Sequence, residues 1–188
     1  MDKRVFLLVL AAAIIGGLCA FKAMRSYSPQ TTVAARPLAE PAPEFELYDQ
    51  SSPSRIVRLE GYLGRHRVVV VFFDGRAGAH ASDVLSRLKD NWSRLHKAEI
   101  YVMAISTALP QENRKDIAQH VEFPFPLLSD PGFQVHRTWG RFDEVAGKPS
   151  TGVFLVDRKG SVAWSRKTNA PEPTENWQSA LERLVAGQ

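Results

Sequence analysis

The stretch whose residues could support chemistry covers positions 67–88, which read RVVVVFFDGRAGAHASDVLSRL. Its run of β-branched and aromatic residues predicts a strand at 68–73 that is buried on both faces. A glycine-containing turn follows at 74–78, and apolar residues spaced three and four apart then predict a helix over 82–96. A helix N-terminus at such a junction can stabilise a thiolate, because its dipole and free backbone N–H groups favour negative charge.

The thiol that this junction could activate is missing. The turn and the start of the helix offer Arg76, Ala77, Gly78, Ala79 and His80. The single cysteine of the chain, Cys19, lies far upstream, so an intrachain disulfide and a CxxC pair are both excluded. The sequence therefore predicts a junction suited to sulfur chemistry that carries no sulfur.

Other chemistry at the junction is disfavoured. His80 stands close to Ser82 and Asp83, but neighbouring residues at a helix start cannot align a nucleophile, a base and an orienting group. We expect Ser82 or Asp83 to cap the helix and His80 to lie on the surface. The five histidines show no HxxxH or HxH spacing, so we predict no metal site and no cofactor.

Composition sets the broad class. The 188 residues are 44% hydrophobic and 23% charged, which is typical of one globular domain with an appendage. The formal net charge is +4, and its Lys and Arg residues are scattered without a basic run. We therefore expect no nucleic-acid partner.

The N-terminal segment predicts a membrane anchor. Residues 5–21 are apolar and uncharged over about 17 positions, the lower limit for a membrane-spanning helix. A cleaved signal peptide is the alternative, but Leu18 and Phe21 fall where cleavage needs small side chains. We expect an uncleaved anchor over residues 1–25 that contacts the bilayer through 5–21, with the folded domain on the exported (periplasmic or lumenal) side of a single-pass protein. A Ser-, Thr-, Ala- and Pro-rich tether over 26–43 then leads to a domain over 44–188.

Strands and helices alternate along that domain. A hairpin is expected around residues 49–54, and further strands at 99–106 and 125–128. Helical patterns occupy 110–120 and 131–139, and a hairpin joins 153–157 to 161–165. A closing helix is expected from about Thr174. This order implies a three-layer α/β/α sandwich.

Several segments resemble the thioredoxin-like redoxins, and among them the peroxiredoxin (AhpC/TSA) branch. Residues 42–47 (APEFEL) are similar to the APDFxL opening of that family. Residues 123–140 (FPFPLLSDPGFQVHRTWG) resemble its FPLLSDPxxxVxxxYG segment, and 154–160 its FLIDxxG hairpin. The resemblance implies a thioredoxin-like fold.

The resemblance also implies a peroxidatic cysteine at the start of the first long helix. That position falls on Ala77, Gly78 or Ala79, depending on where the turn is gapped. A supporting Thr falls on Arg76, and a late arginine falls on about Thr151. Peroxide reduction in this family needs a thiolate that becomes a sulfenic acid, which none of these residues can form.

We therefore expect, as a first hypothesis, a membrane-anchored and catalytically inactive redoxin domain that serves a membrane complex as an interaction or assembly subunit. A homodimer is a further expectation. The contact surface is expected to involve Asp74, Arg76, His80, Trp139, Arg141 and Trp164. The alternatives are a redox enzyme whose thiol comes from a partner, and a small-molecule-binding domain that uses the vacated pocket.

Overall fold

The structure is a computed structural model that describes residues 40–120, 122–167, 182 and 185–186. Its strands are β1 (Glu46–Asp49), β2 (Ile56–Arg58), β3 (Arg67–Phe72), β4 (Ile100–Ser106), β5 (Leu127–Ser129), β6 (Phe142–Asp143), β7 (Lys148–Pro149), β8 (Gly152–Val156) and β9 (Val162–Lys167). Its helices are α2 (Asp83–Asp90), α3 (Trp92–Lys97), α4 (Pro110–Gln119) and α5 (Gln134–Thr138), with 3-10 turns η1 (Glu60–Tyr62) and η2 (Ala79–Ala81).

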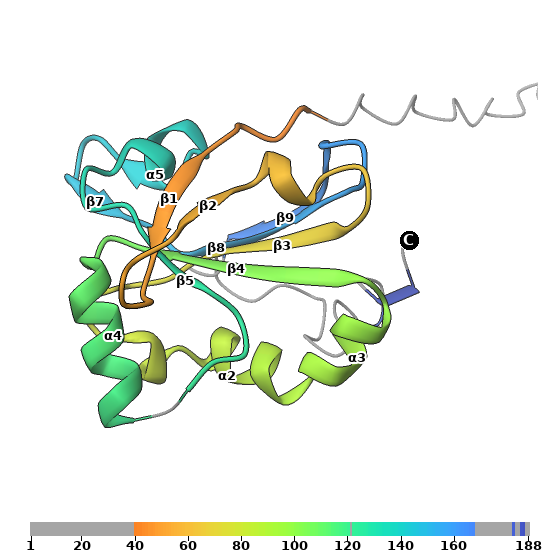
Figure 1. The fold of residues 1–188 in the computed structure, drawn as a ribbon. Coiled ribbons are helices and arrows are strands. Elements are labelled where there is room, and N and C mark those ends of the chain that lie inside the picture. Colours follow the sequence, from red (N-terminus) through yellow and green to blue (C-terminus); the bar gives the residue numbers. More distant parts are fainter. Residues whose placement is uncertain (1–39, 121, 168–181, 183–184, 187–188) are drawn as a thin grey trace, which may run out of the picture. The chain divides into compact units, whose positions relative to one another are not determined.

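A mixed sheet in the order β2-β1-β5-β4-β3-β8-β9 forms the centre of this domain (Figure 1). The pairs β3–β4 and β4–β5 are parallel, and β3–β8 and β8–β9 are antiparallel. Helices α2, α3 and α4 cover one face of the sheet, and α5 lies on the other (Figure 1). The expected α/β/α sandwich, with helices on both faces of one sheet, is therefore confirmed.

The central strand β3 packs both of its faces. Val69 and Val71 belong to the apolar core beneath α2 and α3, together with Leu85, Leu88 and Leu95. Val70 and Phe72 point the other way, into the core that contains Val135 and Trp139. Alternate residues of a strand point to opposite faces, so an unbroken apolar run suits a strand covered on both sides.

The helix expected over residues 82–96 is two helices, so that prediction is wrong in one respect. The break falls at Asn91, whose backbone has φ −100° and ψ 10°. Its side-chain Nδ2 and its backbone N–H both donate to the carbonyl of Arg87, at 2.9 and 3.1 Å. Asparagine competes for backbone carbonyls in this way, which ends α2 and turns the chain into α3.

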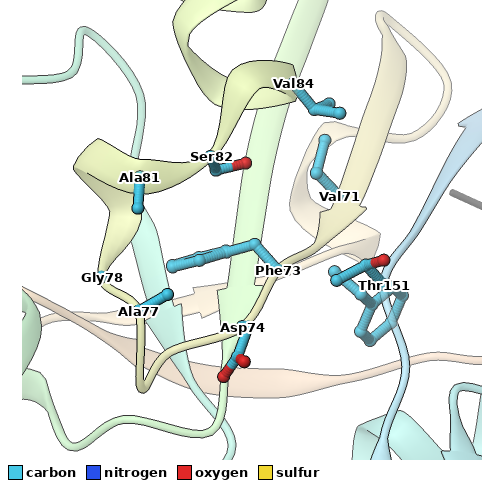
Figure 2. Close-up of a pocket in the computed structure, with 10 residues that line it drawn as sticks. Val71, Phe73, Asp74, Ala77, Gly78, Ala81, Ser82, Val84 and Thr151 are labelled. Atoms are coloured by element: carbon cyan, nitrogen blue, oxygen red, sulfur yellow. The ribbon is translucent and has the colours of Figure 1, made fainter. Parts of the chain in front are cut away.

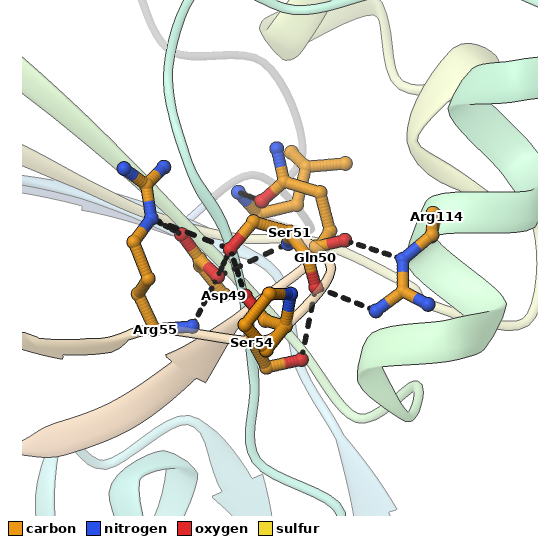
Figure 3. A network of polar contacts seen from close by, with 8 residues as sticks. Asp49, Gln50, Ser51, Ser54, Arg55 and Arg114 are labelled. Carbon is orange, nitrogen blue, oxygen red and sulfur yellow. Dashed lines mark hydrogen bonds and ion pairs between the residues drawn. The ribbon is translucent and has the colours of Figure 1, made fainter.

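The loop between β1 and β2 ties this hairpin to α4 (Figure 3). Asp49 accepts hydrogen bonds from the backbone N–H of Arg55 at 2.8 Å and of Ser51 at 3.0 Å, and another from the Ser51 hydroxyl. Arg114 on α4 donates to the carbonyls of Gln50 and Ser51, at 2.8 and 2.5 Å. The loop therefore fixes the helix that carries Asp116.

The described residues begin within the expected tether, at Glu40. Residues 40–42, which fall within the expected tether, pair with the β8–β9 turn through hydrogen bonds from Ala42 to Gly160 and from Val162 to Glu40, both 2.8 Å. The expected anchor over residues 1–25 lies outside the described residues, as does most of the expected closing helix. In the part of the chain that is described, no helix combines the length and apolar character needed to cross a membrane.

Candidate functional site

The candidate site lies where β3 ends and α2 begins. The chain leaves β3 at Phe72, turns through residues 74–78 and passes through η2 before α2 begins at Asp83. Gly78 has φ +84°, and a Cβ placed on it would lie 2.7 Å from Asp116 Oδ1. Only glycine fits at this position, because it tolerates positive φ and leaves room for the carboxylate.

Helix α4 holds this turn in place. The backbone N–H groups of Ala79 and His80 donate to Asp116 Oδ2, at 2.8 and 3.3 Å. Ser82 is the N-cap of α2, and its hydroxyl accepts from the N–H of Leu85 at 3.4 Å. The expected capping role of Ser82 is confirmed.

A pocket of about 180 Å³ opens at this junction (Figure 2). Its lining comes from the end of β3, the turn, the start of α2 and the residue before β8: Val71, Phe72, Phe73, Asp74, Ala77, Gly78, Ala81, Ser82, Val84 and Thr151. Most of these side chains are apolar, and polar side chains are contributed by Asp74, Ser82 and Thr151. A concave apolar site with a few polar groups is the usual form of a small-molecule site.

The rim of the pocket carries an ion pair between Asp74 and Arg76. Arg76 donates from Nε to Asp74 Oδ1 at 3.2 Å, and its backbone N–H donates to the same oxygen at 3.0 Å. The side-chain hydrogen bond from Arg76 is the main cause that lowers the pKa of Asp74, and it outweighs the opposing effect of burial. Asp74 is therefore ionised near neutral pH, and its charge is balanced by the Arg76 guanidinium that pairs with it.

The structure separates the three positions expected for the vacated cysteine. Ala77 and Gly78 line the pocket, whereas Ala79 is 1% exposed and packs in the apolar core. Ala81 also lines the pocket, and sequence reasoning missed it. Its signal was its place directly before Ser82, the residue expected to cap the helix.

The residues expected to form a contact surface differ in their exposure to solvent. Asp74, Arg76 and His80 share the turn, but Trp139 and Arg141 are each 6% exposed. Arg141 stacks over the ring of Phe154 at 5.4 Å, and burial lowers the pKa of its guanidinium. Trp164 is partly buried against the core. Buried side chains offer little to a partner, so these residues define no single exposed patch.

His80 is not an isolated surface residue. Its Nδ1 lies 2.5 Å from Asp116 Oδ1, and its ring stacks on that of His120 at 3.7 Å. The fold thus brings together three potential metal ligands where histidine spacing had predicted none. The available signal was the four-residue separation of Asp116 and His120, which places both on one face of a helix.

The sheet, the helices on its two faces and the pocket at the β3–α2 junction define a thioredoxin-like redoxin. The AhpC/TSA family matches residues 38–165, and the chain belongs to this family. It is 34% identical over 149 residues to alkyl hydroperoxide reductase E of Mycobacterium tuberculosis, covering 77% of this chain and 95% of that protein. It is 32% identical over 130 residues to the chloroplastic peroxiredoxin Q of Oryza sativa subsp. japonica, covering 65% and 55%.

Solved structures agree on the fold. The crystal structure of peroxidoxin BcpB from Mycobacterium tuberculosis superposes with a TM-score of 0.65 at 21% identity, covering 79% of this chain and 93% of that one. The Mycobacterium bovis AhpC structure gives a TM-score of 0.66 at 17% identity, covering 79% and 90%. The thioredoxin-like fold expected from the resemblance is confirmed.

These comparisons contradict the first functional hypothesis. An inactive interaction subunit of a membrane complex was expected because the junction lacks a cysteine. The relatives matched along most of the domain carry the names alkyl hydroperoxide reductase and peroxiredoxin Q. The hypothesis rested on the absence of a cysteine sulfur at the junction. The comparisons favour the alternative, a redox enzyme whose thiol comes from a partner.

Proposed function

We propose that this protein binds a small organic hydroperoxide in the β3–α2 pocket and promotes its reduction by a thiol that a partner supplies. The observation that carries the proposal is the pocket itself, which lies at a strand–helix junction of an AhpC/TSA domain. The similarity to a protein named alkyl hydroperoxide reductase supports the substrate class. The single cysteine, Cys19, lies outside the domain that carries the pocket, and we therefore propose that the sulfur comes from a partner.

The pocket suits such a ligand in size and in its apolar lining. A volume of about 180 Å³ accommodates a molecule of a few heavy atoms, such as tert-butyl hydroperoxide. The apolar lining favours an alkyl group. The hydroxyl group of Ser82 is a polar group of the lining that would orient a hydroperoxide.

The proposed reaction uses two thiols for each peroxide. The thiolate of the partner attacks the terminal oxygen of ROOH, the O–O bond breaks, and RO⁻ leaves and takes up a proton to become the alcohol. The sulfenic acid that forms then condenses with a second thiol, which yields a disulfide and water. Two thiols are oxidised and one hydroperoxide is reduced. The chain itself binds and orients the peroxide, and the N-terminus of α2 favours the developing negative charge.

The test is hydroperoxide consumption by the full chain in the presence of a dithiol. We expect tert-butyl hydroperoxide to disappear faster than with the dithiol alone, and the C19S variant to retain this rate. The pocket-filling variant A81F should fall back to the rate of the dithiol alone. V145F is the matched control, because Val145 is fully exposed and is not among the residues that line the pocket.

Two results would contradict the proposal. The first is a consumption rate equal to that of the dithiol alone, together with no increase in melting temperature when the hydroperoxide or its alcohol is added. This result would show that the chain does not bind the hydroperoxide. A C19S variant that lost all acceleration would show that this chain supplies its own sulfur, because no other cysteine is present in the sequence.

We also propose that residues 5–21 anchor the protein and that the folded domain lies on the exported side. The support is the apolar sequence of that segment. Retention in the membrane fraction after alkaline extraction, and cleavage of the domain by protease added from the exported side, are the expected results. The homodimer stays a prediction, which the native mass in mild detergent checks.

A further inference from the structure

We propose that His80, Asp116 and His120 bind a divalent transition-metal ion, with Zn²⁺ as the principal candidate, where η2 meets α4. The proposal is independent of hydroperoxide binding. Each residue offers one ligand atom, and the three atoms lie within 4.8 Å of one another. Two imidazoles and a carboxylate are a common donor set for zinc and related metals.

The distances are close to those that a metal requires. Asp116 Oδ1 lies 2.5 Å from Nδ1 of His80 and 3.2 Å from Nδ1 of His120. Ligands at about 2.0–2.1 Å from a tetrahedral Zn²⁺ lie roughly 3.3 Å apart. The Asp116–His120 pair already has this separation, but His120 Nδ1 also lies 3.0 Å from the backbone carbonyl oxygen of Asp116 and has to leave that contact to bind a metal. The His80 ring has to withdraw by about 0.8 Å on the same basis.

The two imidazole side chains, and not the carboxylate, have to move to accommodate the metal. The side chains of His80 and His120 are 37% and 44% exposed, whereas that of Asp116 is 15% exposed. The two rings stack with an interplanar angle of 14°, so sharing one ion requires them to fan apart around the carboxylate. Their exposure leaves space for that rotation.

The carboxylate is held in position by groups outside the proposed coordination sphere. Its Oδ2 accepts the backbone N–H groups of Ala79 and His80, which leaves Oδ1 directed at both imidazoles. Outer hydrogen bonds of this kind orient metal-binding side chains. Asp116 also comes from a helix fixed at its other side by Arg114.

Gly78 provides a second, independent observation. A Cβ at this position would lie 2.7 Å from Asp116 Oδ1 and 2.8 Å from His80 Nδ1, which are two of the proposed ligand atoms. The backbone at Gly78 therefore leaves these atoms a space that any other residue would fill. Gly78 also lines the pocket, so the proposed metal would lie beside the hydroperoxide site.

The alternative is a hydrogen-bonded His–Asp–His cluster that never takes up metal. Three protein ligands leave at least one coordination position for water or another small ligand. A metal there would link η2 to α4 and stabilise the folded state, because an ion that binds only the folded chain shifts the unfolding equilibrium. The two alternatives therefore differ in a measurable way.

The experiment uses the full chain without a histidine tag, freed of metal with a chelator and titrated with Co²⁺ and then Zn²⁺. We expect bound Co²⁺ to give the visible absorption of a low-coordinate ion, to saturate at one equivalent and to be displaced by Zn²⁺. The protein should also have a higher melting temperature with Zn²⁺. H120Q should weaken binding roughly tenfold or more. The matched control is H96Q, since His96 is an exposed histidine on α3.

A second variant keeps the test decisive if one substitution perturbs folding. H80Q removes a different ligand and leaves Asp116 and its two backbone hydrogen bonds unchanged, and circular dichroism confirms that each variant is folded. The proposal is overturned if the wild-type chain takes up no Co²⁺. It is also overturned if H80Q and H120Q both bind the ion as tightly as H96Q, because the metal would then lie elsewhere.

Discussion

Two alanines of the junction, only two positions apart, face different surroundings. Ala81 lines the pocket, whereas Ala79 is buried in the core and its N–H is bound to Asp116. We expect that a cysteine in place of Ala81, in a C19S background, reacts with hydroperoxide, because it would lie directly before the capping residue of α2. Sulfenic-acid trapping, followed by mass spectrometry, measures this reaction.

The control for this substitution is A79C in the same background. A thiol at position 79 would be shielded from solvent, and burial in apolar surroundings suppresses the thiolate. We expect its oxidation to be slower than that of A81C by more than tenfold, in line with the roughly 1.4 kcal/mol that each pKa unit represents. Equal reactivity of both thiols would contradict the positions that we assign to these residues.

Asp49 makes a separate, pH-dependent contribution to stability. Burial by itself would raise the pKa of this carboxyl, but hydrogen bonds from Ser51 and Arg55 and the charge of Arg55 lower it below the ordinary value of 3.8. A lowered pKa in the folded state means that the unfolded chain binds a proton first as pH falls. The stabilisation is therefore complete well above pH 3.8 and is lost as the pH falls from there through the folded-state pKa.

Urea unfolding between pH 3 and pH 7 measures this contribution. We expect D49N to be less stable than wild type at pH 7 by about 1–3 kcal/mol, because the buried acceptor loses its charge-assisted hydrogen bonds. The difference should shrink toward pH 3. A difference that stayed constant across this range would show that ionisation of Asp49 does not stabilise the fold.

The His–Asp–His cluster could not be predicted from the sequence, because it depends on a contact between residues that are distant along the chain. His80 and Asp116 lie 36 residues apart, and their contact depends on the path of the chain through β4 and α4. Asp116 and His120 share a helical face that the sequence predicts, but a helix with one carboxylate and one imidazole is common. The sequence also left the position of the vacated cysteine open, because the 3-10 turn η2 lies between the turn after β3 and the start of α2.

At the scale of elements, strands were more predictable than helix ends. The apolar run of β3 is typical of a strand buried on both faces, because such a run needs helices or other strands to cover both sides. The break between α2 and α3 depends on a single side chain, Asn91, and the spacing of the apolar residues does not predict it. The short hairpin of β6 and β7 was missed for a related reason, because strands of two residues carry no period.

The start of α2 can be tested as an element. Ser82 accepts the N–H of Leu85 at 3.4 Å, a long hydrogen bond. We expect S82A to lower the free energy of unfolding by roughly 0.5–1 kcal/mol, the low end for loss of an N-cap. S86A lies inside the same helix and should be close to neutral, since Ala favours helix more than Ser does. Chemical denaturation of both variants makes the comparison, and a larger loss in S86A would contradict the capping role.

At the scale of the whole domain, one sheet separates two apolar cores that share its strands. Val69 and Val71 belong to one core, and Val70 and Phe72 to the other, so β3 cannot leave either core without disturbing both. The pocket lies at the end of this strand, and the His–Asp–His cluster lies where η2 meets α4. Their geometry thus depends on the stability of the domain as a unit.

This coupling predicts that damage to one core is felt in the other. Leu88 is fully buried beneath the sheet, and L88A should lower the free energy of unfolding by about 2–5 kcal/mol. The indole N–H signals of Trp92 and Trp139 report the two cores separately in a denaturant titration followed by NMR. Both midpoints should fall together, because a domain of this size unfolds cooperatively.

The control is V145A, which removes methyl groups from a fully exposed side chain and should change stability by less than about 0.5 kcal/mol. If the Trp139 signal kept its wild-type midpoint in L88A, the two cores would be independent units, and the junction could open without unfolding the rest of the domain.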